Sequence, residues 1–176
     1  MRFQSSTPRA HVAIALAILA VSAAVLTPAR SEDRQHDWSD DDAGAQSATS
    51  IVRECFELYG FYQDFEHGYA CIWKPSRICI DQYDGGRQNQ YDINTCVGFA
   101  AVAWERLLDD VYDRLMKSGA APKQMETSQS MWRAWNDIDC HAFADYIGTR
   151  AAMDFAACRI RHAAERAIEL IQLIPR

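Results

Sequence analysis

The fold is decided by residues 92–119, DINTCVGFAAVAWERLLDDVYDRLMKSG. Apolar side chains recur in this stretch at steps of three or four residues, at Cys96, Phe99, Ala103, Leu107, Val111 and Leu115. This spacing places them on one face of an α-helix, so we expect an amphipathic helix over residues 92–117. Gly119 follows the last apolar position and is expected to end the helix.

Two further helices are expected on the C-terminal side of this stretch. Residues 122–148 begin with a proline and end with a glycine, and we expect their Trp132 and Trp135 to lie on a buried face. Residues 150–174 follow Thr149, which is expected to cap the third helix. Short connections make neighbouring helices antiparallel. The predicted fold class is therefore all-α, a three-helix antiparallel arrangement with a disulfide-rich, loop-dominated N-terminal segment.

The first 29 residues have the order of a signal peptide. Arg2 and Arg9 precede an apolar run that ends in small residues, and we expect cleavage after Ala29. An uncleaved membrane anchor is the alternative, although the apolar run is short for a bilayer span. Loss of the leader changes the net charge from −6 to −8, because the leader carries two arginines and no acidic residue. With the leader removed, no membrane span is expected.

The segment between the leader and the three helices has two parts. Residues 30–50 are polar and acidic apart from Trp38, and we expect a disordered lead-in there. The stretch from residue 51 to about residue 91 is rich in aromatic residues, glycine and cysteine, which predicts a short helix over 51–58 followed by loops. Residues 51–176 are expected to form a single disulfide-stapled domain.

Six cysteines stand in the chain after the leader: Cys55, Cys71, Cys79, Cys96, Cys140 and Cys158. An even number in an exported chain indicates three disulfides. Cys140 and Cys158 can face each other across the turn between the second and third helices, and we favour Cys79–Cys96 and Cys55–Cys71 for the others. A zinc site using Cys140, Cys158 and His162 is the alternative, but no Cys-x-x-Cys motif supports it, so we expect no metal.

The C-terminal helices carry a set of spaced motifs. Asn94-Thr95-Cys96 is followed by Leu108 and Tyr112, then by Gln129-x-x-Trp132 with Asp137 and Cys140, and finally by Cys158 with Glu165-Arg166. Over residues 79–173 this pattern resembles the LprI-type lysozyme inhibitor family. The chain departs from that family in having Glu105 and Asp109 in place of Asp and Asn, and Asn136 in place of Arg. Arg166 is expected to pair with Asp137 or Asp139.

The leader and the even number of cysteines predict an exported protein, periplasmic or secreted. The resemblance implies that it binds or inhibits a protein partner, a basic lysozyme-type muramidase. The acidic charge is consistent with a basic partner and disfavours nucleic acid, although it can also serve only solubility. The alternative function is a periplasmic immunity or envelope-stress protein that binds another secreted partner, with Tyr62 and Trp73 as contact residues. No catalytic motif or cofactor motif is found, so we expect neither an enzyme nor a cofactor. The acidic pairs Asp109-Asp110 and Asp137 with Asp139 are expected on solvated helix faces.

Overall fold

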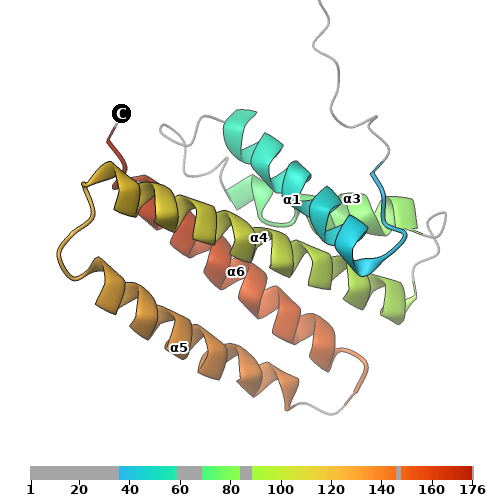
Figure 1. Ribbon diagram of the computed structural model, residues 1–176. Coiled ribbons are helices and arrows are strands. Elements are labelled where there is room, and N and C mark those ends of the chain that lie inside the picture. The colour runs from blue at the N-terminus through green and yellow to red at the C-terminus, as the bar shows by residue number, and fades with distance from the viewer. Residues whose placement is uncertain (1–35, 59–68, 84–88, 146–147, 176) are drawn as a thin grey trace, which may run out of the picture. The chain divides into compact units, whose positions relative to one another are not determined.

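The computed structural model describes residues 36–58, 69–83, 89–145 and 148–175. The chain divides into two units, Met1–Arg34 and Gln35–Arg176, and the described residues all belong to the second. They form the helices α1 (Asp41–Leu58), α3 (Lys74–Gln82), α4 (Gln90–Ser118), α5 (Met125–Ala144) and α6 (Ala151–Ile171), shown in Figure 1. The described residues contain no strand, so the predicted all-α class is confirmed. The leader predicted over residues 1–29 lies outside the described residues.

Helix α4 is the predicted central helix, and it packs against α6, α1 and α3. Asn89 precedes it, and its side chain accepts a hydrogen bond from the Asp92 backbone N–H at 3.0 Å. This N-cap starts the helix two residues before the predicted position. Gly119 ends the helix with φ 72°, a left-handed conformation that glycine adopts without steric cost, so the predicted stop is confirmed.

Helices α4 and α6 form the most extensive contact among the described helices. Both helices bury alanines completely or almost completely: Ala100 and Ala103 on α4, and Ala163, Ala164 and Ala167 on α6. These alanines belong to the same apolar core as the larger side chains of Trp104 and Ile160. Figure 1 shows α6 between α4 and α5. Among the described helices, α5 packs mainly against α6.

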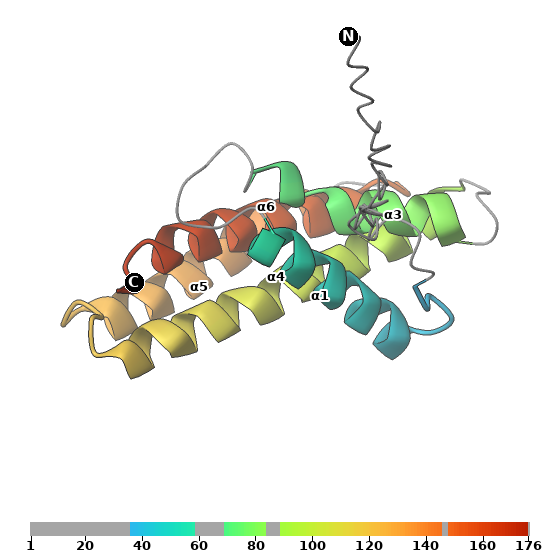
Figure 2. The same ribbon diagram turned by 90° about the horizontal axis from the view of Figure 1, so that it is seen from above.

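Helix α1 corrects the predicted lead-in. We expected disorder over residues 30–50, but α1 begins at Asp41 and lies next to α4 in both views (Figures 1 and 2). Ala45 and Ala48 continue the apolar face of Ile51, Val52, Cys55 and Phe56, and all six are buried. Trp38 is buried as well, because it stacks on Phe99 at a ring distance of 6.1 Å and donates to Gln82 Oε1 at 3.1 Å. These contacts supply the apolar burial that the polar composition alone did not suggest.

Helix α3 is a second element that we did not expect, since its residues were assigned to loops. Pro75 stands at the start of the helix, a position where the missing backbone N–H is not needed. The preceding turn is tied to α4, because Trp104 Nε1 donates to the carbonyl oxygen of Ile72 at 3.0 Å in the core. The N-terminal segment is therefore disulfide-rich as predicted but contains more helix than we expected.

The three disulfides have the predicted pairing, Cys55–Cys71, Cys79–Cys96 and Cys140–Cys158. The first joins α1 to the segment before α3, the second joins α3 to α4, and the third joins α5 to α6. On the chain-entropy model, each closed loop stabilises the fold by about 3 kcal/mol. The cysteines at these six positions are buried.

The predicted second and third helices are present with shorter bounds. Helix α5 ends at Ala144, before Gly148, and α6 begins at Ala151 without a side-chain cap. The predicted cap at Thr149 is therefore wrong: its backbone carbonyl instead accepts a hydrogen bond from Asn94 Nδ2 at 2.9 Å, which fixes the turn against α4. None of the described helices has the length and apolarity needed to cross a membrane.

A pair of glycine substitutions tests the docking of α1. A Cβ added at Gly44 would stand 2.3 Å from the Phe99 ring, whereas one added at Gly98 would meet nothing within 4 Å. Gly44→Ala should therefore lower the free energy of unfolding by about 1–3 kcal/mol, because the Trp38–Phe99 packing must shift. Gly98→Ala, in the middle of α4, should instead raise it by about 0.5–1 kcal/mol. Urea unfolding of both variants measures the difference, and equal stabilities would contradict this packing.

Candidate functional site

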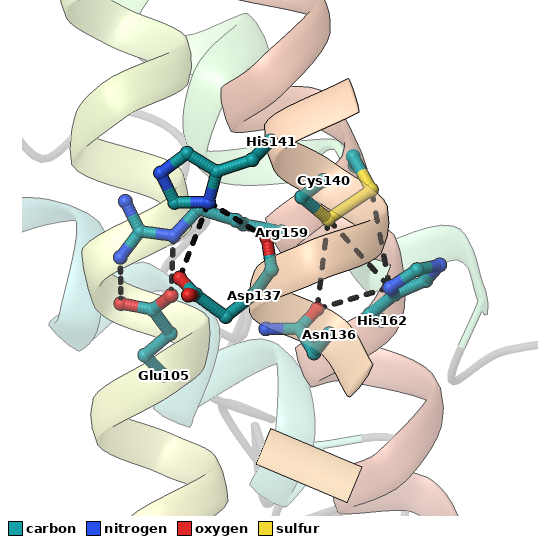
Figure 3. Close-up of polar contacts among 8 residues, drawn as sticks. Glu105, Asn136, Asp137, Cys140, His141, Arg159 and His162 are labelled. Carbon is teal, nitrogen blue, oxygen red and sulfur yellow. Dashed lines mark hydrogen bonds and ion pairs between the residues drawn. A yellow bond between two sulfur atoms is a disulfide. The ribbon is translucent and has the colours of Figure 1, made fainter. Parts of the chain in front are cut away.

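A polar cluster surrounds the Cys140–Cys158 disulfide between α5 and α6. His162 of α6 is 8% exposed, and its Nδ1 lies 2.9 Å from Asn136 Oδ1 of α5. An amide oxygen only accepts, so His162 Nδ1 carries the proton in this hydrogen bond. The same nitrogen lies 3.6 Å from Cys140 Sγ and 3.9 Å from Cys158 Sγ (Figure 3). The histidine is thus held between an amide and the disulfide.

Trp135 covers the outer side of this cluster. Its ring stacks on the His162 ring with centroids 4.6 Å apart and an interplanar angle of 24°. The side chain is nevertheless 48% exposed, so the prediction that Trp135 lies in the core is wrong. Helix α5 packs mainly against α6, so only a narrow face of α5 is buried. Trp135 lies at the edge of that face. Trp132 is partly buried against the core, closer to its predicted place.

Burial lowers the pKa of His162 below its ordinary value of 6.5. Three charged neighbours modify this effect: Asp139 and Glu165 raise the pKa and Arg161 lowers it. Asp139 Oδ2 lies 3.6 Å from His162 Nε2, but it does not outweigh the cost of burying an imidazolium. The ring is therefore neutral at neutral pH.

The cluster also contains a set of atoms that resembles a metal site. Ligand atoms of Asp139, Cys140, Cys158 and His162 all lie within 4.8 Å of one another. Zinc binds cysteine as the thiolate, and both sulfurs are committed to the disulfide here. As long as that bond is intact, Asp139 and His162 supply only two donors, and the arrangement positions α5 on α6 instead.

A partly buried ion pair joins α4 and α6 next to this cluster. Arg159 of α6 makes a two-pronged contact with the Glu105 carboxylate of α4, its Nε at 2.6 Å from Oε1 (Figure 3). The guanidinium also lies over the Phe155 ring, 5.4 Å from its centroid. Both charged side chains are about one-third exposed, so this forked pair is shielded from solvent more than the surface pairs are.

The acidic residues of the two sequence pairs have separate basic partners. Asp109 bonds Arg133 of α5 at 2.7 Å, whereas its neighbour Asp110 pairs with Arg53 of α1. Asp137 lies 3.3 Å from His141 on the exposed side of α5. These carboxylates are half to three-quarters exposed and have separate partners, as expected for solvated helix faces.

Trp73, a predicted contact residue, borders a surface hollow. The side chain is 39% exposed at the start of α3. A cavity of about 460 Å³ is lined by Trp73, Phe143, Asp154, Ala157, Cys158 and Arg161. Tyr62, the other predicted contact residue, lies outside the described residues.

The helices that build this site also carry the family relationship. A protein-family model described as lysozyme inhibitor LprI matches residues 81–170, half of the chain. The chain belongs to the LprI lysozyme inhibitor family. The match runs from the end of α3 through α4 and α5 almost to the end of α6, so the resemblance stated from the sequence motifs is confirmed. No curated protein matches the chain, and no solved structure matches it.

The LprI motif residues serve mainly to join helices. Leu108 is buried in the core, and Tyr112 packs against it. Asn94 holds the turn before α6, and Gln129 is buried and accepts from Arg166. Glu165 is partly buried near His162, where its charge raises the pKa of that histidine.

The positions at which the chain departs from the LprI pattern also have partners: Glu105 bonds Arg159, and Asn136 bonds His162.

Arg166 requires a correction. It was predicted to pair with Asp137 or Asp139, but its Nε donates to Gln129 Oε1 at 3.0 Å and it pairs with Glu169 at 2.9 Å. The disulfide keeps Asp139 beside Cys158. Arg166 lies about two turns after Cys158 on α6. Because α5 runs antiparallel to α6, Arg166 therefore faces the first half of α5, where Gln129 lies.

The exposed apolar face of α5 was not predicted from the sequence. His162 was considered only as a metal ligand, and Trp135 only as a core residue. The signal available was the spacing of Met131, Trp135 and Ile138, which lie on one face of α5 at steps of four and three residues. This face differs from the one that buries Met125, Gln129 and Cys140.

The neutral state of His162 predicts a pH-dependent stability. The unfolded protein takes up a proton on this side chain near pH 6.5, whereas the folded protein does so only at lower pH. The unfolded state therefore binds more protons in that interval, and stability falls as the pH falls. Between about pH 7.5 and about pH 5, the Tm of the wild-type protein should fall more than that of His162→Gln. Parallel Tm curves for the two proteins would refute a neutral buried His162.

Proposed function

We propose that this protein acts outside the cytoplasm and inhibits a lysozyme-type cell-wall hydrolase by binding to it. The observation that carries the proposal is the LprI family match over the three helices α4, α5 and α6. The match covers the disulfide cluster and the exposed face of α5, which are the parts of the molecule best suited to present a fixed surface. A protein that inhibits by binding requires such a surface and needs no catalytic residues.

The rigidity of the body supports a binding role. Three disulfides and the closely packed α4–α6 contact hold the helices before any partner arrives. A preorganised surface loses less conformational entropy on association, so more of the contact energy appears as affinity. The same rigidity favours blocking a substrate cleft, because an inhibitor that deforms easily would be displaced by the substrate.

The charge supports a basic partner. The net charge is −6 for the chain and −8 without the expected leader. Lysozymes are commonly basic and act with a pair of carboxyl groups in a long cleft. Opposite net charges accelerate the encounter of two proteins, and salt weakens this attraction.

The cysteines support export. All six are paired in disulfides, which form and persist in oxidising compartments such as the periplasm. A leader over residues 1–29 agrees with this location. The two acidic pairs, Asp109-Asp110 and Asp137 with Asp139, each lie against separate arginine or histidine side chains, which is more typical of a binding protein than of a catalytic carboxylate pair.

The alternative function, binding of another secreted partner as an immunity or envelope-stress protein, rests on Trp73. An exposed tryptophan beside a hollow with an arginine and an aspartate is typical of a contact anchor. Trp73→Ala should then weaken capture of that partner from an envelope extract while leaving inhibition of lysozyme unchanged.

A lysis assay tests the proposed function. Increasing amounts of the purified, oxidised protein should slow cell-wall lysis by a basic lysozyme and reach a plateau near about one molecule per enzyme if binding is tight. Raising the salt concentration from about 0.05 M to about 0.5 M should weaken the inhibition, since the encounter is electrostatic. Protein reduced and alkylated at its six cysteines is the control and should lose the effect. Unchanged lysis with lysozymes of different classes would overturn the proposal.

A further inference from the structure

We infer that the outer face of α5 is the surface that contacts the hydrolase. We call Met131, Trp135 and Ile138 the α5 stripe; this assignment rests on the proposed function and adds the contact face to it. The three side chains are 69%, 48% and 73% exposed. Positions separated by four and three residues lie on one face of a helix, so they form a continuous apolar strip.

The fold leaves most of this stripe exposed, and the contact described for it is the stacking of Trp135 on His162. Helix α5 packs on α6, and the residues that it buries are Met125, Gln129 and Cys140. The stripe holds three of the seven large apolar side chains that are exposed among the described residues. Isolated exposed apolar residues are ordinary, but a strip of three on one helix is typical of a protein contact.

The centre of the stripe is held in a fixed position. The Trp135 ring stacks on His162, and His162 is fixed by Asn136 and by the adjoining disulfide. Both the ring and the backbone beneath it are therefore ordered before binding. Tryptophan is the side chain most often found as an energetic anchor in interfaces, and prior ordering lowers its entropic cost.

The charge of α5 favours a basic partner. Helix α5 carries the carboxylates Glu126, Asp137 and Asp139, and Asp145 follows at its C-cap. Its single arginine, Arg133, is engaged by Asp109 of α4. Asp139 stands one turn after Trp135, so the anchor has an acidic neighbour. A second copy of this chain would bring the same carboxylates face to face, and an anionic lipid surface would also be repelled. The apolar stripe with its acidic surroundings thus fits a basic protein such as the proposed hydrolase.

A matched pair of lysine substitutions tests this surface. Ile138 in the stripe and Tyr91 at the start of α4 are both 73% exposed, and Ile138→Lys and Tyr91→Lys change the net charge equally. Ile138→Lys should raise the protein concentration for half-maximal inhibition of a basic lysozyme about tenfold or more, whereas Tyr91→Lys should change it less than about twofold. Met131→Lys should behave like Ile138→Lys. Each variant should keep the Tm of the wild-type protein, because none of these side chains is buried.

The outcomes separate the contact face from the function. Wild-type inhibition with equal potency of Ile138→Lys and Met131→Lys would overturn the α5 stripe and leave the proposed function standing. Equal losses in all three lysine variants would also overturn it, because net charge would then explain the effect. If sedimentation shows dimers that Ile138→Lys converts to monomers of full inhibitory potency, the stripe is a self-association face and the assignment is wrong. A wild-type protein without any inhibition would overturn both proposals.

Discussion

The close packing of α6 on α4 is the contact on which the rest of the molecule depends. Two disulfides link α1, the segment before α3, α3 and α4 in succession, and the third links α5 to α6. No disulfide connects these two groups of helices, which meet through the packing of α6 on α4 and through the Glu105–Arg159 and Asp109–Arg133 pairs. The disulfides therefore stiffen each group of helices separately, and the packing of α6 on α4 holds the two groups together.

The position of α5 follows from that arrangement. Since α5 touches the body mainly through α6, its placement depends on the Cys140–Cys158 bond and on the polar cluster of Asn136 and His162. A helix supported on one side exposes most of its circumference. This explains how one chain can combine a buried histidine with an exposed tryptophan stacked on it, and why the apolar residues of α5 are shared between core and surface.

The sequence predicted the features that depend on local pattern. Helical spacing revealed α4, α5 and α6, and the even number of cysteines with their places on neighbouring helices gave the pairing. The features that depend on distant contacts were not predictable in this way. The burial of Ala45 and of the preceding Trp38 stabilises α1. Residues 41–50 of this helix are too polar to be predicted as ordered from composition alone. The partner of Arg166, Gln129, was not predictable because it depends on which part of α5 lies opposite Arg166 in the folded protein. Trp135 was misplaced because α5 has apolar residues on two faces, and periodicity does not tell which one is covered.

The order of the disulfides along the chain has a consequence for biogenesis. Each cysteine is bonded to the next one in sequence, with separations of 16, 17 and 18 residues, so no loop encloses another. A polypeptide that emerges amino end first can close every loop as soon as its second thiol appears, before the following pair is exposed. An oxidase that joins consecutive thiols as they emerge therefore makes the native bonds directly, with no need for an isomerase to reshuffle them.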